Sequence, residues 1–201
     1  MHKVFISYHH DNDQWAKDHL LVLNALYDIF IDKSVDTGDI DDSLLSETIR
    51  TKIRDEYLRD STVTILLVGK ETMFRKHVDW ELYSSMRDSA INKKSGILVV
   101  MLPDIALDYY TVGHGDIEKR VVYPDTTSWT RISTRSEYEK RYPYMPDRII
   151  DSLLKGASIS VVKWDKIATS PETLKLLIEW THKDRAECDY DLSRPMRRHN
   201  G

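Results

Sequence analysis

The sequence predicts an α/β fold in which a parallel sheet of about five strands is flanked by helices. Short apolar runs rich in β-branched residues alternate with segments of helical spacing along the chain. The clearest run, residues 61–69 (STVTILLVG), is apolar on both faces, as a central parallel strand requires. Strict alternation of strand and helix implies right-handed crossovers and helices on both faces of the sheet.

The expected elements follow one another in a regular order. The predicted strands cover residues 3–8, 28–32, 61–69, 95–102 and 157–164, and the predicted helices cover residues 14–27, 44–60, 77–90, 146–156 and 170–183. In the first helix, Trp15, Val22, Leu23 and Leu26 recur at helical spacing and predict its apolar face. The last helix has a clear start signal, because Ser170 can cap it and the next residue is a proline.

Two segments stand apart from this alternation. Residues 103–146 carry tyrosines, prolines and the sequence VGHGD, and we interpret them as a long irregular insertion into a single domain that spans residues 1–182. Residues 183–201 are polar and end in the locally basic stretch SRPMRRHN. We expect this basic stretch to be a solvated or frayed end.

Composition limits the classes of protein to consider. The chain has 201 residues, is 41% hydrophobic and carries a net charge of −4, which argues against a dedicated nucleic-acid binder. It has no apolar run near 18 residues, so no membrane span is expected, and its start does not resemble a signal peptide. The single cysteine, Cys188, cannot form an internal disulfide and fits a reducing cytoplasm.

Several familiar sites are excluded by their residues. Gly113 and Gly115 form a GxG pair, but Glu118 stands where a dinucleotide fingerprint needs its third glycine. No phosphate-loop lysine pattern and no GxSxG nucleophile elbow occur. A phosphate-accepting receiver domain needs an aspartate at the end of the third strand, where this chain has LLVGK. The cluster His9, His10, Asp11 and Asp13 is too local to converge on one ion, so no metal is expected.

Glu81 is the carboxylate with the most unusual surroundings. It lies between Trp80 and Leu82 in the first turns of the predicted helix 77–90, whose buried face is marked by Val78, Leu82 and Met86. It should stand at the border of that face, partly buried, close to the carboxyl ends of the strands where open α/β sheets bind ligands. The helix N-terminus should favour its ionised form.

At this point the residues resemble TIR domains, whose fold is flavodoxin-like. KVFISYHHDND is similar to the TIR opening strand and loop, IFIDKSVDTGDI to the second strand and the acidic BB loop, and STVTILLVGKETMFRKHVDWEL to the segment with the catalytic glutamate. The resemblance covers roughly residues 1–102. Over its whole length the chain is similar to the bacterial group that includes the TIR proteins of Thoeris anti-phage systems. It departs from the family pattern in having Trp80 directly before Glu81 and Gly69 in place of a serine.

The resemblance implies an enzyme that cleaves the nicotinamide–ribose bond of NAD and makes a free, cyclic or conjugated ADP-ribose signal. Nicotinamide leaves as a neutral ring, so no general acid is needed, and an ionised carboxylate near the ribose stabilises the oxocarbenium-like sugar. Glu81 takes that role by resemblance. The substrate-binding positions implied in the same way are Ser7, Tyr8, His9, His10, Asp32 and Trp80. NAD is the substrate, and no separate cofactor is expected.

The resemblance also implies partners. The loop 33–43 corresponds to a loop through which TIR proteins contact neighbouring subunits, so we expect self-association there. A downstream effector that senses the nucleotide and a phage-derived trigger are further expected partners. The alternative is a non-catalytic TIR-type interaction module. The insertion is either a structural flap or a lid, in which glycines around His114 let the backbone approach a ligand near Glu81.

Overall fold

The computed structural model describes residues 1–34, 58–88 and 93–201. Its strands are β1 Lys3–Ser7, β2 Ile31–Asp32, β3 Val63–Val68, β4 Gly96–Met101 and β5 Ser160–Lys163. They form one sheet in the order β2-β1-β3-β4-β5, and every pair of named strands is parallel. The predicted α/β fold with five parallel strands is confirmed, and residues 44–57 of the predicted helix 44–60 lie outside the described residues.

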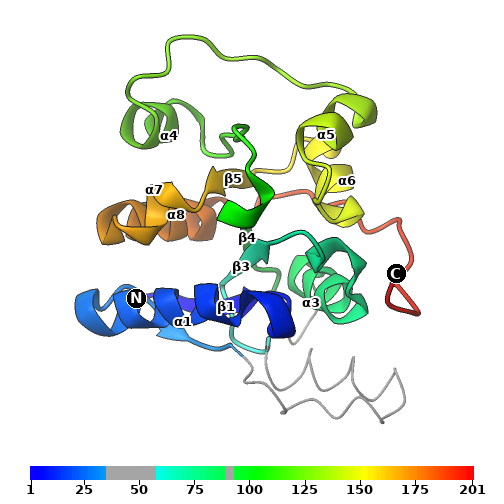
Figure 1. Ribbon diagram of the computed structural model, residues 1–201, viewed down its shortest axis with the longest axis horizontal. Coiled ribbons are helices and arrows are strands. Elements are labelled where there is room, and N and C mark those ends of the chain that lie inside the picture. Colours follow the sequence, from blue (N-terminus) through cyan, green and yellow to red (C-terminus); the bar gives the residue numbers. More distant parts are fainter. Residues whose placement is uncertain (35–57, 89–92) are drawn as a thin grey trace.

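Helices cover the two faces of the sheet (Figure 1). They are α1 His10–Tyr27, α3 Lys76–Met86, α4 Gly115–Val122, α5 Arg135–Arg141, α6 Asp147–Lys155, α7 Asp165–Ala168 and α8 Pro171–Asp184, with the short 3-10 turns η2 Thr72–Phe74 and η3 Pro103–Ile105. Among the described residues, no helix is both long enough and apolar enough to cross a membrane.

The strands divide the core into two halves, because alternate side chains point to opposite faces. Ile6, Ile65 and Leu98 face α1, α7 and α8 in one cluster. Leu66 and Val99 face α3 and α6 in the other. Each residue of β3 and β4 is buried, which explains why these strands read as continuous apolar runs.

The predicted apolar face of α1 is wrong. Trp15, Val22 and Leu26 are exposed, whereas Ala16 and Leu20 are fully buried. The helix begins at His10, so most of the predicted polar loop belongs to its first turn. The buried face therefore includes Asp13 and Lys17. A prediction based on the spacing of hydrophobic side chains does not identify a face that contains such polar residues.

The insertion is more ordered than expected, and it contains η3, α4 and α5. Thr111 forms an antiparallel bridge with Val161, which places the segment along the outer edge of β5. A Cβ on Gly113 would lie 2.6 Å from the backbone of Ile159, so this glycine allows close contact with the strand. Glu118 accepts a hydrogen bond from Ser160, the first residue of β5. This part of the insertion therefore lies toward the amino ends of the strands.

The lid alternative does not fit this part of the insertion, since Glu81 contacts Ser7 at the carboxyl end of β1. His114 packs instead against α8: its Nδ1 lies 2.8 Å from Asp184 Oδ2 and its Nε2 lies 3.1 Å from Thr181 Oγ1. These contacts fit the alternative in which the insertion is a structural flap.

The prediction of a solvated or frayed end at SRPMRRHN is correct only in part, because Ser193, Pro195 and residues 198–200 are exposed but Arg197 and Asn200 are hydrogen-bonded to α3. The polar segment before this stretch is partly buried. Cys188 and Tyr190 are buried in the second core cluster, beside α6. The chain then continues past α6 to α3, and in Figure 1 its end lies next to α3. Burial raises the pKa of the Cys188 thiol, and the cysteine is free. The polar composition of this segment concealed a set of specific hydrogen bonds to the fold.

Candidate active site

The strand order places the ligand crevice that is expected of an open α/β sheet at the carboxyl ends of β1 and β3. The chain runs from β1 to β2 on one side and from β3 to β4 on the other, so the loops after β1 and β3 diverge there. In open α/β sheets such a switch point is the usual place for a ligand. The segments after β1 and after β3 supply its polar side chains, and α3 supplies Glu81.

Glu81 is buried more deeply than predicted, with 2% of its surface exposed. The hydroxyl of Ser7, the last residue of β1, lies 2.5 Å from Glu81 Oε2. Burial raises the pKa of this carboxyl to about 8, and the Ser7 hydrogen bond opposes the rise only in part. The field of the helix N-terminus, which we expected to favour the ionised form, does not offset this loss of solvation.

Tyr8 and His10 form a stacked pair beside Ser7. Their ring centroids are 4.5 Å apart with an interplanar angle of 17°. Tyr8 is buried and donates its hydroxyl hydrogen bond to Gln14, while the ammonium of Lys17 lies 5.5 Å from the centre of its ring. Burial, followed by the charge of Lys17, lowers the pKa of His10. A neutral imidazole stacked on a phenol gives this wall of the crevice an aromatic character.

His9 connects the loop after β1 with the segment after β3. The Nε of Arg75 donates to His9 Nε2, and the guanidinium also contacts Glu71 at 3.4 Å. Burial, followed by the Arg75 charge, lowers the pKa of His9. Arg75 and Glu71 were not singled out in the sequence, although the polar segment that holds them follows a strand, and that position was the available signal.

Asp13 is a second buried carboxylate near the crevice that sequence reasoning missed. Thr72 Oγ1 lies 3.3 Å from its Oδ2, and the same hydroxyl accepts a hydrogen bond from the backbone of Gly69. Burial, followed by the nearby charge of Asp104, raises the pKa of Asp13 to about 6. A Cβ on Gly69 would lie 2.8 Å from both carboxylate oxygens, so the absence of the family's serine makes room for Asp13.

Two predicted site residues lie elsewhere. Asp32, at the end of β2, is exposed and accepts hydrogen bonds from the backbone and hydroxyl of Ser34. Trp80 is 1% exposed and donates its indole hydrogen bond to the carbonyl of Arg197 in the tail. Trp80 therefore makes a structural contact with the tail.

Among the residues that the structure describes, no group of three or more histidine, cysteine or acidic side chains could hold a metal ion.

The comparison with protein families decides the assignment. A family model described as Thoeris protein ThsB, TIR-like domain, matches residues 5–106, about half of the chain. The chain belongs to this family. The match covers the last three residues of β1 and all of β3 and α3, and with them Ser7 and Glu81. No curated protein matches the chain.

Proposed function

We propose that this ThsB-type TIR-like domain cleaves the nicotinamide–ribose bond of NAD and releases an ADP-ribose-derived signal in anti-phage defence. The observation that carries the proposal is the Ser7–Glu81 contact of 2.5 Å at the carboxyl ends of the strands. A carboxylate held there can stand beside the ribose and stabilise its developing positive charge. Family membership supports the same chemistry.

The state of Glu81 suggests that the domain rests in an inactive form. With a pKa raised to about 8, the carboxyl is mostly protonated at neutral pH and cannot stabilise a cation. Activation then has to admit substrate and restore the charge, and the positive ring of NAD next to Glu81 would lower its pKa. A phage-derived trigger or self-association would supply such a change, and an effector would sense the product.

A non-catalytic interaction module is the second candidate, and one observation favours it: Glu81 has only 2% of its surface exposed. In that case the crevice would be part of the fold and would bind no substrate. The two candidates differ in whether phage protection depends on the Glu81 carboxylate or only on the fold.

Mass spectrometry of small molecules from phage-infected cells tests the proposal. Cells with the wild-type protein should lose NAD and accumulate nicotinamide with an ADP-ribose derivative, whereas cells with Glu81→Gln should not. Glu179→Gln, the same chemical change on the exposed face of α8, is the matched control and should behave as wild type. Protection by Glu81→Gln without any change in NAD would support the interaction module instead.

A further inference from the structure

The helix that carries Glu81 has no side-chain cap of its own. Its N-cap residue, Arg75, makes no capping hydrogen bond. Instead, Asn200 Oδ1 accepts from the backbone N–H of Lys76 at 2.9 Å, and the N–H of Gly201 donates to the carbonyl of Phe74 at 2.9 Å. The first turn of α3 is thus completed by residues 194–201, which we call the strap.

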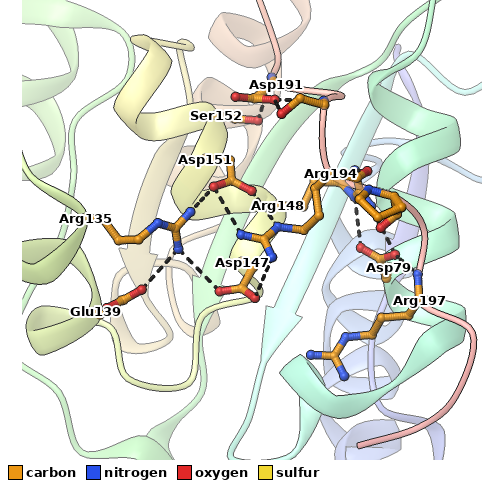
Figure 2. A network of polar contacts seen from close by, with 12 residues as sticks. Asp79, Arg135, Glu139, Asp147, Arg148, Asp151, Ser152, Asp191, Arg194 and Arg197 are labelled. Atoms are coloured by element: carbon orange, nitrogen blue, oxygen red, sulfur yellow. Dashed lines mark hydrogen bonds and ion pairs between the residues drawn. The ribbon is translucent and has the colours of Figure 1, made fainter.

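The strap also holds the two residues that precede Glu81. The N–H of Arg197 donates to Asp79 Oδ2 at 2.8 Å, and the carbonyl of Arg197 accepts from the Trp80 indole at 2.7 Å. Both hydrogen bonds come from the backbone of one strap residue. Figure 2 shows Arg197 reaching Asp79. These bonds hold α3 in one rotation about its axis and at one position along that axis, immediately before Glu81.

Arg148 of α6 links the strap to α3. Its side chain has no exposed surface, and its Nε and Nη2 donate to the two oxygens of Asp79 at 2.9 and 3.1 Å. Its Nη1 donates to the carbonyl of Arg194 at 3.1 Å. The side chain of Arg194 in turn contacts Asp151 of α6 at 2.7 Å (Figure 2). The buried guanidinium needs both Asp79 and the strap to satisfy its donors.

We propose that the strap, acting through Asn200, Arg197 and Arg148, positions Glu81 for catalysis, an inference that rests on the proposed function. Glu81 lies within hydrogen-bond distance of Ser7, and its helix has only 11 residues in which to be held. A displacement of about 1 Å at a reacting group can lower turnover by about 100-fold. Asn200 is exposed, so the cap can be lost without opening the core.

The test compares three variants of the full chain. Asn200→Ala removes the cap of α3, and Asn200→Asp keeps an acceptor oxygen at the same place. Ser170→Ala removes a cap of the same kind from α8, where the Ser170 hydroxyl accepts from the N–H of Thr173. The kcat and KM for nicotinamide release from NAD are measured well below the melting temperature of each variant.

Asn200→Ala should lower kcat about tenfold with KM nearly unchanged, Asn200→Asp should restore it, and Ser170→Ala should lower the melting temperature without changing kcat. Equal kcat in Asn200→Ala and wild type would overturn the positioning role while NAD cleavage stands. If the wild-type protein releases no nicotinamide, backbone hydrogen exchange tests the role of the strap instead. Faster exchange across residues 76–81 in Asn200→Ala, but not in Ser170→Ala, supports the strap, and unchanged exchange overturns it.

Discussion

At the scale of single residues, Glu81 shows how burial and local fields compete. Its carboxyl group lies in the first turns of a helix, where the partial positive charge favours the anion, yet its pKa is raised to about 8 because water is excluded. Ser7 supplies one hydrogen bond, which recovers only part of the lost solvation. The pKa of Glu81 therefore lies close to neutral pH, where a charged ligand can change the protonation state of the carboxyl group.

The raised pKa predicts a pH-dependent stability difference. Between pH 4.5 and about 8 the folded protein binds a proton at Glu81 that the unfolded chain has released, so unfolding becomes easier as pH rises. This loss has a slope of at most about 1.4 kcal/mol per pH unit. Glu81→Gln lacks this pH-dependent loss of stability. The free energy of unfolding of the variant, relative to that of the wild type, should therefore increase from pH 5 to pH 8. Urea unfolding at both values checks this, and a constant difference would show that Glu81 does not hold the proton.

Gly69 predicts a second effect at this scale. In Gly69→Ala the new Cβ would lie 2.8 Å from the carboxylate oxygens of Asp13, which the short aspartate side chain cannot easily avoid. The substitution should cost about 1–3 kcal/mol of stability, as overpacking does. The same change in an Asp13→Ala background should cost much less. Equal costs in the two backgrounds, measured by denaturant unfolding, would show that the collision is not the cause.

At the scale of elements, the ion pair between α3 and α6 predicts a strong asymmetry. Arg148 is fully buried and shares Asp79 with the strap. Removing one partner leaves a buried charge unpaired and typically costs about 3–5 kcal/mol. We expect Asp79→Asn to lose stability in that range, and Asp79→Asn with Arg148→Met to lose less. A double variant that is less stable than the single one would contradict the unpaired-charge explanation.

The elements also show how far the sequence could be read. Continuous apolar runs placed β3 and β4 correctly, because strands buried on both faces are mostly apolar. The face of α1 was misread because Asp13 and Lys17 are buried through specific partners, and hydrophobic spacing does not register them. Glu81 and Ser7 were found by resemblance to a family motif. Arg75 and the strap were missed because they depend on contacts between distant segments.

At the scale of the whole molecule, assembly remains a proposal. The loop 33–43 lies largely outside the described residues, and its sequence carries four aspartates, Asp36, Asp39, Asp41 and Asp42. We expect this negative charge to take part in self-association. Asp39→Lys or Asp41→Lys should lower signalling in infected cells with little change in melting temperature. Full signalling by both variants would leave the loop without a role in assembly.

The rate of nicotinamide release from NAD by the wild-type protein and by Glu81→Gln tests the central claim most directly. Both proteins are assayed alone and with lysate from phage-infected cells, so that an activating component is present. The wild type should release nicotinamide in the activated condition, and Glu81→Gln should be about 10²–10³ times slower because it cannot stabilise the sugar cation. Equal rates in that condition would show that Glu81 is not the catalytic carboxylate.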